Sequence, residues 1–369
     1  MKIGLALMRM RVRGGMERDC LAIGRALAAR GHDVHLLTTE PQYAQDAAFA
    51  VREIHVPRYM GPRRLAAFAE AIRELRKHET FDAVISFGRV VGCEFHYAAE
   101  LPFRRRGFPF SWLPRVRTYG KLEAAIHSPS APSRTIFYLT ERQREAYRAL
   151  YGDMDQRSCV IPVIRHDDRP VPAKFYAKRE NVRRKLAIPA NAPLAVLVAT
   201  KPLKKGLLRI LAAMPRFPLL HLLVVGASRN AQWKLAELIH RVGDRVHCVP
   251  YSDEVMDLIG AADFMVHPSD EDSAGLAIVE GLSSGIPVIV TENCGYADLV
   301  VRLDAGLVIP VPFQGLALSS AIEGVIGNLD RMKGQAREAA MALNREPSWT
   351  DEVANAVERL GLGASQNAA

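Results

Sequence analysis

A cluster of lysines in the second half of the chain stands where phosphate groups are commonly bound. Lys201, Lys204 and Lys205 belong to TKPLKKG, which starts at the end of the apolar run PLAVLVAT. Lysines at the carboxyl end of a strand in an α/β fold can hold a diphosphate, whereas a lysine cluster elsewhere is usually a solvated surface. Their position after a predicted strand therefore favours the binding of an anionic ligand.

Carboxylates gather further along the chain, around the stretch EDSAGLAIVEG. SDED contains Asp270, Glu271 and Asp272, and Glu280 follows Asp272 by eight positions, with Gly275 between them. Clustered carboxylates can bind a divalent cation. A D-x-D tripeptide is common by chance, however, and no second set of ligands accompanies this one. We therefore expect no metal site.

Three smaller features add candidates for ligand contacts. Gly14 and Gly15 precede a predicted helix, where glycine lets backbone approach a ligand and the free N–H groups attract an anion. A plain tight turn explains the same pair. Asp19, one turn later, either complements the helix dipole or points into a site. His267, before Pro268, is either a satisfied histidine at a strand end or a donor to a sugar hydroxyl.

A basic aromatic segment, residues 101–121, interleaves cations with Phe, Trp, Leu and Tyr side chains. Its cations are Arg104, Arg105, Arg106, Arg115, Arg117 and Lys121. This composition suits an anionic membrane interface. RNA binding and a solvated basic loop with inward aromatics are the alternatives. Because no RNA-binding signature accompanies the segment, we expect an anionic membrane surface rather than nucleic acid.

The elements that position these residues alternate along the chain. KIGLAL, DVHLLTT, FDAVISFG, RTIFYLT and SCVIPVI have the length and apolarity of buried strands, and GGMERDCLAIGRALAARGH shows a helical stripe that Gly31 closes. A second series, PLAVLVAT, LLHLLVVGA, RVHCVPY, DFMVHPS and IPVIVTE, starts after a charged, proline-containing stretch at 166–193. Strand, helix, strand repeats favour parallel sheets. We expect two Rossmann-like domains, residues 1–165 and 166–347, facing a central cleft.

The bulk properties fit a soluble protein of the cytoplasm. A chain of 369 residues exceeds one hydrophobic core, and 49% hydrophobic with 24% charged residues is globular composition. The five cysteines form no C-x-x-C pair, which argues against a zinc site or a disulfide framework. No run of apolar residues is long enough for a signal peptide or a membrane helix. The net charge of +9 suits phosphate-bearing substrates or anionic surfaces.

Taken in order, these motifs resemble the retaining glycosyltransferases of family 4, which have the GT-B fold. The similarity is greatest to the bacterial lipopolysaccharide core glucosyltransferases that add the first outer-core glucose. It extends over nearly the whole chain, and its most specific part is the block AGLAIVE, GIPV and CGYA; its other matches are GGMERD, AARGHDV, HYAAE, YLTERQ, KKG and HP. The resemblance implies a C-terminal helix, about 348–363, that crosses back to the first domain.

The resemblance also implies roles for individual residues. Lys205 matches the lysine that neutralises the leaving diphosphate, and Lys204 falls where the nearest relatives carry a basic residue. Asp272 takes the acidic position that holds the transferred sugar, and Glu280 the one that binds the ribose hydroxyls. The remaining donor-site positions are Gly14, Gly15, Thr200, His267, Ala274, Gly275 and Leu276.

Asp19 matches an acidic residue of the first loop and helix, which contacts the acceptor or the sugar. Two positions depart from the family pattern. The first acidic residue is usually glutamate, and here either Asp272 or the neighbouring Glu271 reaches the sugar. Thr200 stands where many members have arginine, which the lipopolysaccharide-type members also lack.

The implied function is transfer of a hexose, glucose favoured, from a UDP-sugar to a lipopolysaccharide-core or related cell-envelope glycan. The implied enzyme needs no cofactor or metal and works at the inner face of the cytoplasmic membrane, where a lipid-linked acceptor would be found. A hydrolysing sugar-nucleotide epimerase shares the fold and is the first alternative. A non-enzymatic basic protein that binds RNA or membrane is the second, and it leaves the pair Asp272 and Glu280 without a purpose.

Overall fold

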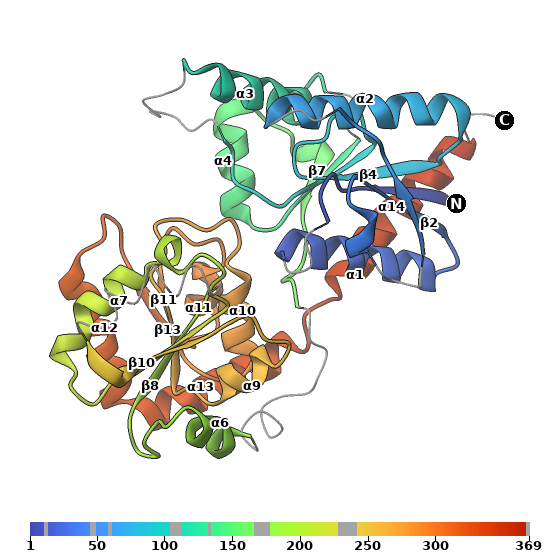
Figure 1. Ribbon diagram of the computed structural model, residues 1–369. Coiled ribbons are helices and arrows are strands. Elements are labelled where there is room, and N and C mark those ends of the chain that lie inside the picture. Colours follow the sequence, from blue (N-terminus) through green and yellow to red (C-terminus); the bar gives the residue numbers. More distant parts are fainter. Residues whose placement is uncertain are drawn as a thin grey trace. The chain divides into compact units, whose positions relative to one another are not determined.

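The computed structural model describes residues 1–10, 14–44, 49–57, 61–103, 112–131, 134–165, 178–227 and 242–366. The chain forms two compact units (Figure 1). One contains Met1–Ile164 together with Pro347–Ala369, and the other contains Arg165–Glu346. Each unit is a parallel sheet covered by helices, which confirms the α/β class predicted from the alternating pattern.

The sheet of the first unit has the order β3-β2-β1-β4-β5-β6-β7 and is parallel throughout. Its strands are β1 (Lys2–Ala6), β2 (Asp33–Thr38), β3 (Ala50–Glu53), β4 (Ala83–Phe87), β5 (Phe95–Ala98), β6 (Thr135–Tyr138) and β7 (Ser158–Val160). The helices are α1 (Gly15–Ala29), α2 (Pro62–His78), α3 (Pro114–His127), α4 (Glu141–Tyr151) and α14 (Trp349–Gln366), with short 3-10 turns η1 (Pro41–Tyr43) and η2 (Asp155–Arg157).

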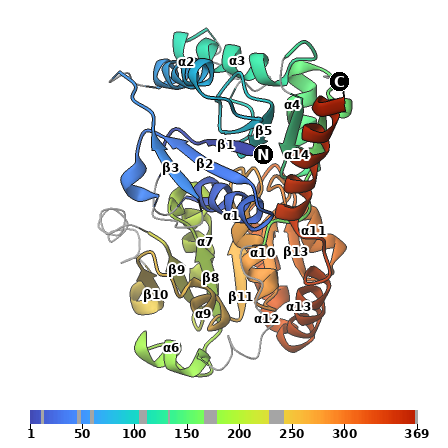
Figure 2. The same cartoon turned by 90° about the vertical axis from the view of Figure 1, so that its right-hand side faces the viewer.

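The two faces of this sheet are covered by different helices. Phe68 and Ile72 of α2 pack against Leu37 and Val84 on one face. On the other face, α1 lies so close that a Cβ on Gly24 would come within 2.9 Å of the Leu5 side chain. Helix α14 packs along α1, as Figures 1 and 2 both show, so the C-terminal helix returns to the unit where the chain begins.

The second unit has a six-stranded parallel sheet of order β10-β9-β8-β11-β12-β13. Its strands are β8 (Leu194–Val198), β9 (His221–Val225), β10 (Val246–Val249), β11 (Phe264–His267), β12 (Val288–Thr291) and β13 (Gly306–Ile309). The helices are α6 (Arg179–Lys185), α7 (Leu207–Ala213), α9 (Val255–Gly260), α10 (Leu276–Ser283), α11 (Ala297–Arg302), α12 (Gly315–Gly327) and α13 (Leu329–Leu343), with 3-10 turns η3 (Pro202–Lys205), η4 (Met214–Arg216) and η5 (Gly243–Arg245).

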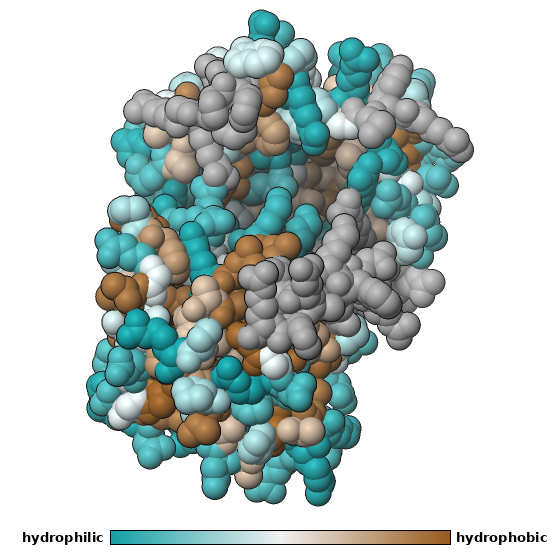
Figure 3. All heavy atoms as spheres, turned by 60° about the vertical axis from the view of Figure 1, so that its left-hand side comes forward, coloured by the Kyte–Doolittle hydropathy of each residue, from teal (hydrophilic) through white to brown (hydrophobic). Residues whose placement is uncertain are grey.

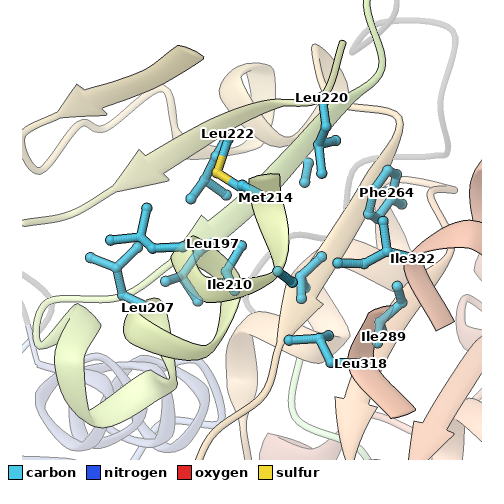
Figure 4. Packing of buried hydrophobic residues seen from close by; sticks show 14 of the residues in the cluster. Leu197, Leu207, Ile210, Met214, Leu220, Leu222, Phe264, Ile289, Leu318 and Ile322 are labelled. Atoms are coloured by element: carbon cyan, nitrogen blue, oxygen red, sulfur yellow. The ribbon is translucent and has the colours of Figure 1, made fainter. Parts of the chain in front are cut away.

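Alternation along the strands of the second sheet divides its core into two layers. Leu197, Phe264 and Ile289 point to the face that α7 and α12 cover, where Ile210 and Ile322 meet them (Figure 4). The side chains next to them, Met265 and Val288, lie on the opposite face against α10. Because successive side chains of a strand point to opposite faces, both layers are apolar and every central strand is buried.

The ten predicted strands are confirmed, and three more are found. β3, β5 and β13 escaped prediction because they lack a long apolar run: AVRE is a polar edge strand, FHYA carries a histidine, and GLVI begins with glycine. The predicted first helix is α1, and Gly31 follows its end with φ of +83°, which suits glycine. On the surface, hydrophobic residues lie among hydrophilic ones (Figure 3), as in other globular proteins.

Candidate active site

The second sheet reverses its strand order between β8 and β11. From β8 the chain proceeds outward to β9 and β10, and from β11 it proceeds the other way to β12 and β13. The loops that leave the carboxyl ends of β8 and β11 therefore emerge side by side and diverge. Such a reversal is where open α/β sheets bind their ligands.

The two loops at this reversal are locked together. Gly206, which follows η3, has φ of +86°, and a Cβ there would lie 2.1 Å from the carbonyl oxygen of Pro268. Only glycine fits both the left-handed conformation and this contact. Arg209 donates to the same carbonyl at 2.9 Å, and Ser269 Oγ donates to the carbonyl of Lys204 at 3.2 Å. The backbone around Lys205 is thus fixed against the β11 loop.

Lys205, His267 and Asp272 meet at this place. Lys205 Nζ and His267 Nε2 both bond Oδ2 of Asp272, the histidine at 3.0 Å. His267 is 1% exposed, and the Asp272 side chain is 15% exposed. Burial by itself would raise the pKa of Asp272, but the bonds from His267 and Lys205 outweigh it and lower the pKa to about 2. Asp272 is therefore an anion at neutral pH, held by a cation and an imidazole.

Backbone contacts hold Asp272 from the other side. Its carbonyl accepts from the N–H of Gly295 at 3.1 Å, and a short parallel bridge joins it to Cys294. Gly275, with φ of +82°, then turns the chain into α10, and Glu280 stands on the second turn of that helix. The spacing of the two carboxylates thus places one on a loop beside the strand end and the other on the helix.

The other predicted donor residues line the same two loops without joining this cluster. Thr200, Lys201 and Lys204 are exposed on the loop after β8. Ala274 and Gly275 are buried, and Leu276 at the start of α10 is half-buried. The sequence allowed two interpretations of His267, a histidine satisfied by the protein or a donor to a sugar hydroxyl. In the structure its Nε2 is hydrogen-bonded to Asp272.

The first sheet reverses its order between β1 and β4, and the glycine loop lies there. Gly14 caps α1 and Gly15 is its first residue. Asp19, 2% exposed, accepts a hydrogen bond of 2.8 Å from the hydroxyl of Tyr97 on β5. The Tyr97 ring lies 6.5 Å from that of Trp349 on α14. Tyr97 was not predicted from the sequence, although it lies in HYAAE, one of the stretches that carry the family resemblance.

Comparisons with known proteins agree with this architecture. The family model described as Glycosyltransferase Family 4 matches residues 13–163, and the model described as Glycosyl transferases group 1 matches residues 178–340. The two matches divide the chain as its two sheets do. The chain belongs to the family 4 glycosyltransferases.

Individual relatives of this glycosyltransferase point the same way. It is 28% identical over 320 residues to lipopolysaccharide glucosyltransferase WaaG of Escherichia coli strain K12, an alignment that covers 84% of this chain and 85% of WaaG. A crystal structure of WaaG, described as involved in lipopolysaccharide biosynthesis, superposes with a TM-score of 0.83 at 23% identity, over 96% of this chain and 99% of that one. These findings confirm the GT-B fold and favour a glycosyltransferase over both alternatives, the epimerase and the non-enzymatic protein.

Another solved structure, which contains a sugar nucleotide, has the same fold as this glycosyltransferase. HepE of Anabaena in complex with UDP-glucose superposes with a TM-score of 0.72 at 15% identity, and the match covers all of both chains. At that identity the likeness concerns the fold alone. It shows that a chain of this architecture accommodates a sugar nucleotide.

The two aspartates of the D-x-D tripeptide, Asp270 and Asp272, bind different side chains. Asp270 pairs with Arg209, whose guanidinium also lies 3.9 Å from the ring centroid of Phe313. Asp272 is engaged by Lys205 and His267 instead. Within the described residues, no three His, Cys, Asp or Glu side chains are grouped so that they could hold a metal ion. Arg209 was not among the residues that sequence analysis singled out.

The basic aromatic segment of the glycosyltransferase is described only in part. Arg104, Arg105 and Arg106 lie outside the described residues. Arg115, Arg117 and Lys121 are exposed on α3, and Trp112 just before this helix is 69% exposed. No helix in the described part of the chain is long and apolar enough to span a membrane.

One end of this segment is held by a buried ion pair. Glu123 of α3 is fully buried and accepts from Arg89 Nε at 2.7 Å and from the backbone N–H of Phe103 at 2.6 Å. The hydroxyl of Tyr151 donates to its other oxygen at 2.8 Å. The Phe103 and Tyr119 rings pack with centroids 4.4 Å apart. The exposed cations of α3 are therefore presented on a fixed base.

Proposed function

We propose that this glycosyltransferase transfers a hexose, with glucose favoured, from a UDP-sugar to a lipopolysaccharide-core or related cell-envelope glycan. The observation that carries the proposal is the meeting of Lys205, His267 and Asp272 at the strand reversal of the second sheet. The similarity to the lipopolysaccharide glucosyltransferase WaaG supports the acceptor class and the sugar. The likeness to HepE with UDP-glucose supports the donor.

Each part of the donor has a matching group in the second unit. Lys205, with Lys204 beside it, neutralises the leaving diphosphate. Asp272 binds hydroxyls of the transferred sugar, and Glu280 on α10 binds the ribose hydroxyls. The N-terminus of α10 adds a favourable potential for phosphate oxygens. The other residues that the resemblance assigns to the donor are Thr200, His267, Ala274, Gly275 and Leu276 of this unit, and Gly14 and Gly15 of the first unit.

We propose further that the transfer retains the anomeric configuration and needs no metal. As the bond between the sugar and the diphosphate breaks, negative charge grows on the diphosphate, and preorganised lysines stabilise it. The leaving phosphate then accepts the proton of the acceptor hydroxyl, so that no protein base is needed on the opposite face. Gly15 of the first unit approaches the donor diphosphate or the transferred sugar, and Asp19 contacts the acceptor or the sugar, with Tyr97 bonding the Asp19 carboxylate.

The experiment that tests this function is an assay with UDP-glucose and a truncated lipopolysaccharide core. Proton NMR of the product gives the anomeric configuration, and we expect the same one as in the donor. Activity should persist in ethylenediaminetetraacetate. Loss of turnover that magnesium or manganese restores would overturn the metal-free mechanism, and formation of an epimer from donor alone would overturn the transferase.

We propose that α3 brings the enzyme to an anionic membrane surface where a lipid-linked acceptor lies. The exposed cations Arg115, Arg117 and Lys121 would each gain about 1 kcal/mol near a charged leaflet. Exposed Trp112 suits the level of the headgroups. Binding should therefore rise with the anionic lipid content of the membrane and fall with salt.

Vesicle cosedimentation measures this binding. The triple variant Arg115→Gln, Arg117→Gln and Lys121→Gln should bind anionic vesicles more weakly and retain turnover of a soluble acceptor. A matched triple variant, Arg331→Gln and Arg337→Gln on α13 with Arg345→Gln just after it, removes equal charge from exposed positions elsewhere. Equal binding of neutral and anionic vesicles would contradict the electrostatic account. The cations of the undescribed stretch, Arg104, Arg105 and Arg106, form a second set for the same assay.

A further inference from the structure

Two groups that the proposed function gives to different parts of the donor bind each other in this structure. Lys205 is assigned to the diphosphate and Asp272 to the sugar, yet Lys205 Nζ bonds Oδ2 of Asp272. A diphosphate bound by Lys205 competes with this carboxylate for the charge of the same ammonium group. The inference below rests on the proposed function and concerns the consequence of an exchange of Lys205 between them.

Of the two partners, only the lysine side chain is free to move. Asp272 is held through Oδ2 by His267 at 3.0 Å and through its backbone by Gly295 and Cys294. The backbone next to Lys205 is fixed, because Gly206 packs against Pro268. The Lys205 side chain remains 27% exposed on a flexible stem. The exchange therefore moves Nζ and leaves the carboxylate where it is.

His267 is the second side-chain partner of Asp272. Its ring is buried, and its Nε2 lies 3.0 Å from Oδ2 of the carboxylate. This hydrogen bond remains when the lysine leaves, because His267 lies at the end of β11 and Asp272 is fixed by its backbone.

Departure of Lys205 consequently leaves the largely buried carboxylate of Asp272 with His267 as its remaining side-chain donor. An uncompensated buried charge is strongly unfavourable, and new hydrogen bonds to it are correspondingly favourable. The hydroxyl groups of a hexose are donors of the required kind. A free nucleoside diphosphate lacks the hexose, and the proposed function assigns its ribose hydroxyls to Glu280, so it takes the lysine without compensating the carboxylate of Asp272.

We propose that Asp272 competes with the diphosphate for Lys205 and so makes the site discriminate between a nucleotide sugar and a free nucleoside diphosphate. The hydroxyls of the sugar donate hydrogen bonds that replace the lost contact of the carboxylate with Lys205, and the diphosphate alone offers no such bonds. The leaving nucleotide is therefore bound less tightly once the sugar has been transferred. Asp272 acts as a specificity determinant of the donor site and favours product release.

Isothermal calorimetry with inorganic pyrophosphate, UDP and UDP-glucose in metal-free buffer tests the proposal. We compare the wild type with Asp272→Asn, with Lys205→Met and with the double variant. The Asn side chain keeps the shape of Asp272 and removes its charge. Pyrophosphate and UDP should bind Asp272→Asn about fivefold more tightly than the wild type, from the strength of a partly exposed ion pair. UDP-glucose should bind no more tightly.

The double variant separates competition from simple repulsion. In the Lys205→Met background, Asp272→Asn should leave pyrophosphate affinity unchanged, since no lysine remains to be released. A gain that persists there would overturn the proposal, because it would come from charge repulsion alone. Unchanged or weaker pyrophosphate binding by Asp272→Asn would overturn it as well. If Asp272→Asn folds poorly, the same measurement of pyrophosphate affinity is made on Asp272→Ser, which also removes the charge.

Two controls complete the design. Asp270→Asn removes an equal charge from the same loop without touching Lys205, because Asp270 pairs with Arg209 and is 76% exposed. It should not reproduce the gain, and a fivefold gain there would contradict the competition. Replacing UDP by ADP and GDP tests the proposed donor separately. A preference for another base would change the proposed donor nucleotide. The ratio of the pyrophosphate affinities of Asp272→Asn and the wild type would still test the competition for Lys205.

Discussion

Each unit holds an aspartate near the strand reversal of its sheet, Asp19 buried and Asp272 partly exposed, but the two have different partners. Asp19 in the first unit accepts from the phenol of Tyr97 at 2.8 Å, and Asp272 in the second is bonded by Lys205 and His267. A neutral phenol is not drawn away by an approaching phosphate, whereas an ammonium group is. The contrast indicates that the first site is built to keep its carboxylate in place and the second to exchange charge with its ligand.

The largest effect should follow from removing Lys205 from the cluster that it forms with His267 and Asp272. Lys205→Met removes the cation that stabilises the leaving diphosphate, so kcat should fall roughly 100- to 1,000-fold, as when one preorganised donor is removed. Turnover of UDP-glucose measures it. Lys201→Met removes an exposed lysine from the same loop and should keep nearly full activity. Equal losses in both variants would show that only the overall positive charge matters.

Glu280→Ala should have the next largest effect, on nucleotide affinity. Each ribose hydroxyl would lose a charged acceptor worth roughly 1.5–3 kcal/mol, so UDP should bind at least tenfold more weakly by calorimetry. Glu323→Ala removes an exposed glutamate from α12 as a control. Unchanged UDP affinity in Glu280→Ala would exclude the ribose role.

A smaller effect is expected at the first site. Tyr97→Phe deprives Asp19 of its phenol donor, which costs about 2 kcal/mol for a buried acceptor, and we expect a roughly thirtyfold loss of kcat. Tyr138→Phe is the control, since this buried hydroxyl bonds His127 Nδ1 at 2.9 Å. It should lower stability and leave kcat unchanged. A Tyr97→Phe enzyme with normal kcat would mean that the phenol serves folding only.

The last expected effect concerns the stability of the two units in acid and not their activity. In the first unit, burial and nearby Arg89 lower the pKa of His96 to about 3, and burial with His96 nearby lowers that of His127. Their unfolded pKa is about 6.5, so the unfolded state takes up protons first as the pH falls. Stability is therefore complete above about pH 6.5 and is lost below it, by about 1.4 kcal/mol per pH unit for each histidine.

Urea unfolding of the wild type and of His127→Phe between about pH 7 and pH 5 measures this dependence. The variant should lose less stability on acidification than the wild type. His55→Asn, which alters an exposed histidine, should match the wild type. In the second unit, the half-buried pair His221 and His247 also has lowered pKa values, chiefly through burial, and should add a weaker dependence. Equal slopes for the wild type and His127→Phe would contradict the assignment.

Local patterns in the sequence predicted the layers of this fold but not the contacts across them. Periodicity located ten strands, because each is an apolar run. β5 was missed, and with it Tyr97, because FHYA shows no such run although all four residues are buried. The strand is central because of its neighbours, which a local pattern does not contain.

The candidate site shows the same limit. The sequence placed Lys205 and His267 at strand ends, Asp272 on the loop before a helix, and Gly275 at the start of that helix. That they share one oxygen atom depends on β8 lying beside β11, a pairing between segments about 70 residues apart in sequence. The resemblance to a known family supplied roles for these residues, but the pairing of Lys205 with Asp272 comes from the structure.

The return of α14 to α1 has a consequence for synthesis of the chain. Arg30 pairs with Asp351 and Glu358, and Val353 and Val357 are buried in the first unit. The ribosome makes this helix only after the whole second unit. Until then, the surface of α1 that packs against α14 is uncovered in the nascent first unit. Domains generally fold in order of synthesis, and exposed apolar surface promotes aggregation. A chaperone that binds the emerging protein should therefore be retained on the first unit until the whole of α14, Trp349–Gln366, has been synthesised.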